Sequence, residues 1–140
     1  MSARAPTVWW RFRLSRARLL TLTSLIITAG YAVALASFEE QPLAGVDDSV
    51  AKMVARQVVV TTFARLLVIA ATFWLVLWRS RAGYGLAIFI GVATLVLFAV
   101  AAAAAQDSGP SDVPLWLQLI GAAASLAMVL GGVVSWRQAR

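Results

Sequence analysis

The chain has 140 residues, of which 61% are hydrophobic and only 13% are charged, and its mean hydropathy is +0.84. Soluble domains are usually about 45–50% apolar and about 25% charged, so this composition indicates a membrane protein and excludes disordered, collagen-like and coiled-coil chains. The net charge is +6, and the sequence contains no cysteine and no histidine, which excludes disulfides and metal sites built from thiolate or imidazole ligands.

After a basic leader at residues 1–18, the sequence contains four long apolar stretches at 19–38, 58–78, 84–105 and 115–136. A helix needs roughly 20 apolar residues to cross a bilayer core about 30 Å thick, and each stretch is long enough. We therefore predict an all-α, four-helix transmembrane bundle that forms a single domain over residues 19–140. Ala34-Leu35-Ala36 resembles a signal-peptidase site, but the long leader and long apolar run favour an uncleaved first helix.

The short segments between these stretches differ in charge. The leader, the turn at 79–81 and the tail at 137–140 hold nine arginines and no acid, whereas the other two loops hold all six acids. Because basic residues in short loops stay in the cytoplasm, we expect both termini to be cytoplasmic. The preference for arginine over lysine, with many alanines and valines, suggests a bacterial chain, so we expect an inner-membrane location. The arginines border apolar runs, which favours the membrane over nucleic acid as the partner.

The leader mixes tryptophan with arginine and has the pattern of a segment that lies at a membrane surface. We expect contacts with anionic lipids at the cytoplasmic face through Arg11, Arg13, Arg16 and Arg18. The simpler alternative is that these charges only set the membrane orientation.

Arg65 is the one charge inside an apolar stretch. It lies roughly 10 Å from the nearer end of its predicted helix, at 1.5 Å per residue. Thr61, Thr62 and Thr72 share its helix face. An arginine at membrane depth is costly, so this polar stripe indicates a binding site for an anion, a quinone or a lipid headgroup. Alternatively, Arg65 extends to the membrane surface or pairs with Glu39 or Glu40.

The fourth stretch carries small residues at helical spacing, which lets helices approach closely in lipid. The principal stripe is Ala123, Ala127, Gly131 and Ser135, with Gly121 and Ser125 beside it. Two interpretations remain open. The stripe forms an interface with another subunit, or it packs inside the four-helix bundle.

The acidic loops offer no persuasive metal site. Asp47, Asp48 and Ser49 are better placed to cap the second helix, where negative charge is favourable. We expect no metal and no cofactor. A carboxylate at membrane depth, a nucleophile motif and a nucleotide fingerprint are all absent from the sequence, so we expect neither an enzyme nor a proton-coupled antiporter.

These features favour a small, non-catalytic accessory or structural subunit that packs against a larger membrane partner. The first alternative is a homo-oligomeric channel or carrier for an anion or amphiphile. The second is a lipid- or quinone-binding module. Both alternatives use Arg65.

Overall fold

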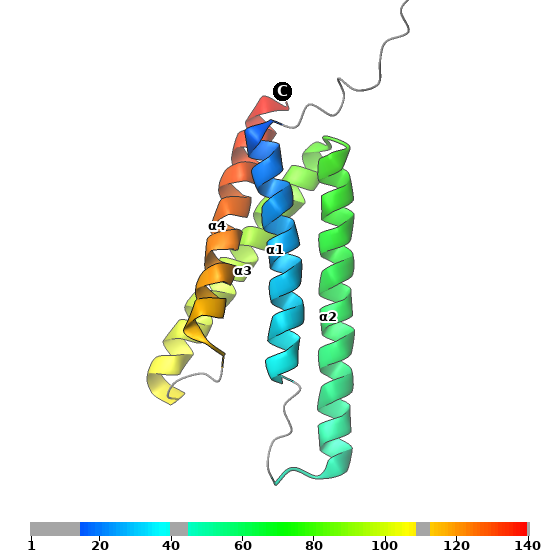
Figure 1. The fold of residues 1–140 in the computed structure, drawn as a ribbon, viewed down its shortest axis with the longest axis vertical. Coiled ribbons are helices and arrows are strands. Elements are labelled where there is room, and N and C mark those ends of the chain that lie inside the picture. The colour runs from blue at the N-terminus through cyan, green and yellow to red at the C-terminus, as the bar shows by residue number, and fades with distance from the viewer. Residues whose placement is uncertain (1–14, 40–44, 109–112, 140) are drawn as a thin grey trace, which may run out of the picture.

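The computed structural model describes residues 15–39, 45–108 and 113–139, which form helices running alternately in opposite directions (Figure 1). The helices are α1 (Arg16–Glu39), α2 (Asp48–Leu77), α3 (Arg81–Ser108) and α4 (Leu115–Gln138). Each is long and apolar enough to span a membrane. The prediction of an all-helical chain with four candidate membrane spans is therefore confirmed.

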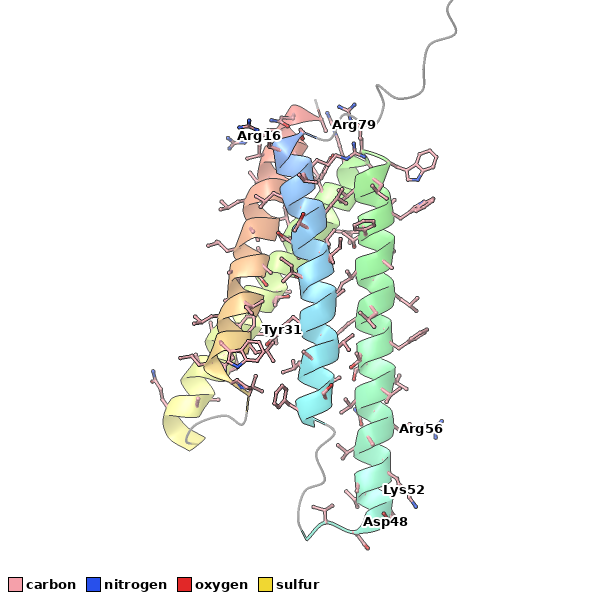
Figure 2. The ribbon with its side chains drawn as sticks, viewed as in Figure 1. Arg16, Tyr31, Asp48, Lys52, Arg56 and Arg79 are labelled. Carbon is pink, nitrogen blue, oxygen red and sulfur yellow. The ribbon has the colours of Figure 1, made fainter. Side chains whose placement is uncertain are left out.

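The bundle has two ends of different character. The leader end holds the start of α1, the α2–α3 turn and the end of α4, and the acidic-loop end holds the opposite end of every helix (Figure 1). Figure 2 shows Arg16 and Arg79 at the leader end, and Asp48, Lys52 and Arg56 at the acidic-loop end.

Three helices, α1, α2 and α3, begin earlier than their predicted apolar stretches. In α1, Ser15 takes the cap position, where its Oγ accepts a hydrogen bond from the amide of Arg18 at 3.3 Å. In α2, Asp47 is the cap residue, although its side chain makes no capping bond. Asp48 lies in the first turn and pairs with Lys52 at 3.0 Å. Negative charge is favourable at a helix start, so α2 extends past its apolar run.

The α2–α3 turn ends α2 with a tight pair of backbone hydrogen bonds. The amide of Ser80 donates to the carbonyl of Leu75 at 3.0 Å, and that of Arg79 donates to Val76 at 3.1 Å. This is the Schellman pattern, which requires a left-handed residue after the helix. Arg79 fills that position with φ +56°. Glycine usually stands there, because a side chain is strained in this conformation.

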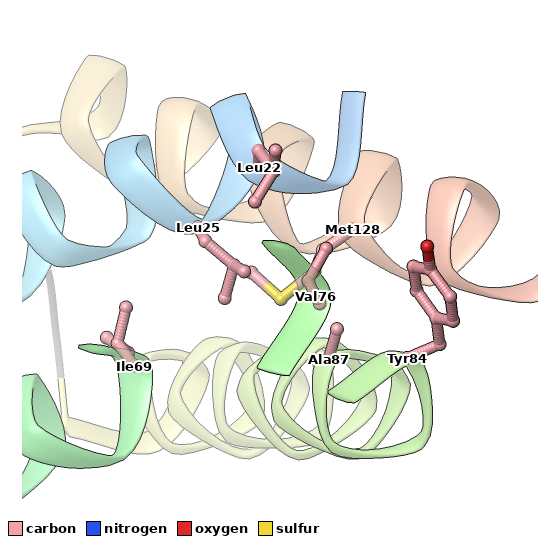
Figure 3. Close-up of a cluster of buried hydrophobic side chains, with 7 residues drawn as sticks. All are labelled: Leu22, Leu25, Ile69, Val76, Tyr84, Ala87 and Met128. Carbon is pink, nitrogen blue, oxygen red and sulfur yellow. The ribbon is translucent and has the colours of Figure 1, made fainter. Parts of the chain in front are cut away.

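The hydrophobic core lies in the leader-end half. Seven residues from all four helices form it: Leu22, Leu25, Ile69, Val76, Tyr84, Ala87 and Met128 (Figure 3). Helix α4 packs closely between α1 and α3, whereas α2 buries only Ile69, Thr72 and Val76. Large apolar side chains such as Phe63, Trp74 and Trp78 are exposed. This distribution is typical of helices surrounded by lipid.

Candidate functional site

A large groove opens along the acidic-loop half of the bundle. Its volume is about 750 Å³, and its walls come from α1, α2 and α3, with the start of α4 at one end. The lining is mainly apolar, with Leu35, Val68, Phe89, Leu97 and Phe98 among its side chains. Small-molecule sites usually occupy roughly 300–1,000 Å³ and are largely apolar, so the groove has the size and character of a ligand site.

The groove lies where α3 diverges from α2 toward the acidic-loop end (Figure 1), and many of the α3 side chains in its wall are small. Ala93, Ala101, Ala102 and Ala105 all lie in its wall. Nearer the leader end, larger side chains close the bundle, and the groove stops at Ile69 and Ile90, where it meets the core. The groove is therefore open at one end of the bundle and packed shut at the other.

Arg65 lines this groove and is the only charged residue among the described residues that do. Within the described part of the chain, its guanidinium makes no hydrogen bond and no ion pair. The side chains of Glu39 and Glu40, the acids proposed as partners, lie outside what the structure describes. A cationic group with no partner among the described residues therefore faces an apolar groove.

The threonines that share the Arg65 helix face are divided between two environments. Thr61 lines the groove with Arg65, whereas Thr62 and Thr72 do not. Thr72 is fully buried and donates to the carbonyl of Val68 at 2.7 Å. The polar groups that complete the groove come from other helices, and sequence spacing along α2 did not indicate them: Thr28, Tyr31, Thr94 and Gln118.

The small residues of α4 mostly pack inside the bundle. A Cβ at Gly121 would lie 2.6 Å from Phe98 and 2.9 Å from Tyr31, and one at Gly131 would lie 2.6 Å from Thr21. Ser125 and Ser135 are also buried. Ala127 is half-buried and Ala123 is exposed. Most of the stripe therefore contacts α1 and α3 of the same chain, and Ala123 alone faces fully outward.

The leader arginines have different environments. Arg11 and Arg13 lie outside the described residues, and Arg16 is exposed. Arg18 is only 2% exposed. Its Nε donates to the carbonyl of Val76 at 3.1 Å, and its Nη2 donates to that of Leu77. Sequence analysis assigned Arg18 to the membrane surface and did not predict its buried position at the end of α2.

In the described part of the chain, no three residues of the types that bind metals are grouped closely enough to hold an ion. No family of known proteins, no curated protein and no solved structure matches the chain.

Proposed function

We propose that the protein is a non-catalytic, multi-pass protein of the bacterial inner membrane that binds one anionic amphiphile in the groove beside Arg65. The alkyl part lies along the apolar wall, and the anionic head pairs with the Arg65 guanidinium. The observation that carries the proposal is the apolar groove of about 750 Å³, in which Arg65 is the only charged residue among the described residues of the lining.

The charge distribution supports the proposed orientation. Arg79 and Arg81 adjoin the turn at the leader end, and Arg137 lies in the last turn of α4. Asp47 and Asp48 begin α2 at the other end. The excess of basic residues would remain in the cytoplasm with both termini. The groove would then open in the outer leaflet, where lipid chains can enter it from the side.

The proposal of an anionic ligand rests on the free energy needed to place the charged Arg65 side chain within a membrane. An arginine in the middle of a transmembrane helix costs about 2.5–3.5 kcal/mol on insertion scales. A carboxylate or phosphate head would offset this cost through charge-assisted hydrogen bonds, which are roughly twice as strong as neutral ones. A neutral quinone would gain less from the same side chain.

The direct test is binding of parinaric acid, a fluorescent fatty acid, to the purified protein in mild detergent. Removing a hydrogen bond to a charged group should raise Kd roughly tenfold in Arg65→Gln. Arg56→Gln is the matched control, because Arg56 is exposed on the same helix outside the groove. Ala93→Phe should also weaken binding by filling the groove.

The methyl ester of the same fatty acid, which lacks the negative charge, tests whether the ligand must be anionic. We expect the ester to bind about tenfold more weakly than the acid to the wild type, and equally with the acid to Arg65→Gln. Equal binding of acid and ester to the wild type would point to a neutral occupant. Unchanged binding in both Arg65→Gln and Ala93→Phe would refute the groove as the site.

An accessory subunit of a larger membrane complex is the second candidate. The exposed Ala123 and half-buried Ala127 leave a small-residue surface on α4 that a partner helix could approach. The test is co-purification from the native membrane after Ala123→Leu, which leaves the buried glycines intact. Loss of a stoichiometric partner would support this role. Retention of the partner would show that it does not bind through the surface formed by Ala123 and Ala127.

A channel or carrier has less support. The groove stops at the core, where Leu25, Val76 and Met128 are fully buried. A path across the membrane would have to form between copies of the chain. Flux through liposomes that is abolished by Arg65→Ala would revive this alternative.

A further inference from the structure

A second, polar cavity lies at the leader end, far along the bundle from the groove. Its volume is about 50 Å³, and its walls include Arg18 from α1, Arg79 from the α2–α3 turn, Tyr84 from α3 and Ser135 from α4. A buried water needs roughly 10–15 Å³ of such space, so this cavity is large enough for a few waters or one tetrahedral oxyanion.

Arg18, which lines the cavity, has one donor group that makes no hydrogen bond to the described residues. Two of its nitrogens donate to the carbonyls of Val76 and Leu77. The third, Nη1, is buried and has no partner among the described residues. Because a buried donor without a partner costs about 1–3 kcal/mol, an acceptor for Nη1 would stabilise the site.

Ser135 is the second polar group of this kind. The other buried serine and threonine hydroxyls donate to the carbonyl four residues earlier in their own helix, as Ser125 does to Gly121 at 2.8 Å and Thr28 does to Ser24 at 2.8 Å. The Ser135 Oγ has no such partner in the described structure, although the residue is only 3% exposed. Its hydroxyl is therefore available to a ligand in the cavity.

Arg79 and Tyr84 complete the wall. Arg79 adds a second positive charge from a left-handed backbone position at φ +56°. A strained non-glycine residue often marks a functional position. Tyr84 is 3% exposed, and Figure 3 shows its hydroxyl pointing away from α3. No acid occurs in residues 1–38, 49–106 or 113–140, so the neighbouring segments bring no carboxylate side chain to these two arginines.

We propose that this cavity is an oxyanion site for a phosphate group. Arg18 Nη1, the Ser135 hydroxyl and the Arg79 guanidinium would bind the phosphate oxygens. Arginine suits this role, because its donors remain charged and match the geometry of a phosphate. The phosphate belongs to a lipid headgroup or is free in solution. The site shares no residue with the Arg65 groove.

The test is isothermal titration calorimetry of the full chain in non-ionic detergent at constant ionic strength. The probes are inorganic phosphate, dioctanoyl phosphatidylglycerol and dioctanoylglycerol, which lacks the phosphate. Binding of inorganic phosphate indicates a site for the free ion. Binding of phosphatidylglycerol alone indicates a lipid headgroup site. Either result supports the proposal, provided that the variants described below weaken binding of that probe and that dioctanoylglycerol binds more weakly than the probe does.

Ser135→Ala and Arg79→Gln remove ligand groups without removing the bonds that Arg18 makes to α2. Each should raise the Kd of the phosphate probe roughly tenfold. Arg137→Gln is the matched control, because it removes an exposed charge from the same end of the bundle. Arg65→Gln should leave phosphate binding unchanged, which separates this site from the groove. Absence of binding by both inorganic phosphate and phosphatidylglycerol, or an equal loss of binding in Arg137→Gln, would overturn the proposal.

Discussion

The packing of Gly83 against the backbone of α2 gives the sharpest test of the fold. A Cβ added at Gly83 would lie 2.6 Å from the carbonyl carbon of Leu75 and 2.7 Å from the amide nitrogen of Val76. Both are backbone atoms held by the bonds of the α2–α3 turn, so they cannot rotate away. Overpacking costs about 1–3 kcal/mol, and we expect the upper value here. Alanine's better helix propensity returns at most about 1 kcal/mol, leaving a net loss of about 2 kcal/mol for Gly83→Ala.

Gly30 provides the matched control. It also lies inside a helix, and a Cβ built there meets no atom within 4 Å. Gly30→Ala should therefore stabilise the protein by about 0.5–1 kcal/mol. The free energy of unfolding is measured for both variants by titration with SDS in mixed micelles, followed by circular dichroism. If Gly83→Ala is as stable as the wild type, the packing of α2 against α3 described above is wrong.

Three further outcomes follow from the contacts, each measured by the same titration. Gly131→Ala should cost about 1–2 kcal/mol, because its Cβ would lie 2.6 Å from the Thr21 hydroxyl, and Thr21→Ala should recover part of that loss. Arg18→Met should cost about 1–3 kcal/mol, because the carbonyl of Leu77 loses its bond to that side chain. Lys52→Gln should change stability by less than about 0.5 kcal/mol, because its ion pair with Asp48 is largely exposed.

Hydropathy alone predicted the number of helices and their approximate positions. An uncharged run long enough to cross a bilayer has few alternatives to a helix, since every backbone group must be bonded internally. The ends were less predictable. Helix α2 begins at Asp48 rather than at 58. The charged residues before 58 interrupt the apolar pattern, but they are compatible with the first turns of a helix. The capping position expected around Asp47 and Asp48 does coincide with the start of α2.

Site residues were harder to predict, because they depend on contacts between helices. The placement of Arg65 beside Thr61 could be predicted from α2 alone, but the groove beside them depends on how α1 and α3 lie against α2. Arg18 shows the same limit. It shares a face with the buried Leu22 and Leu25, at helical spacing, and this was the available signal. The neighbouring arginines favoured the surface interpretation instead, because a basic leader is typical of a segment at the membrane surface.

The left-handed conformation of Arg79 makes a final prediction that links stability to binding. A side chain in this region costs roughly 1–2 kcal/mol, and glycine removes that cost while gaining freedom in the unfolded chain. Arg79→Gly should therefore raise the free energy of unfolding by up to about 1 kcal/mol while weakening phosphate binding as Arg79→Gln does. Arg79→Gln keeps the backbone strain and should leave stability nearly unchanged. If Arg79→Gly is less stable than Arg79→Gln without phosphate, glycine relieves no backbone strain at position 79, and the left-handed conformation gives no support to a ligand site.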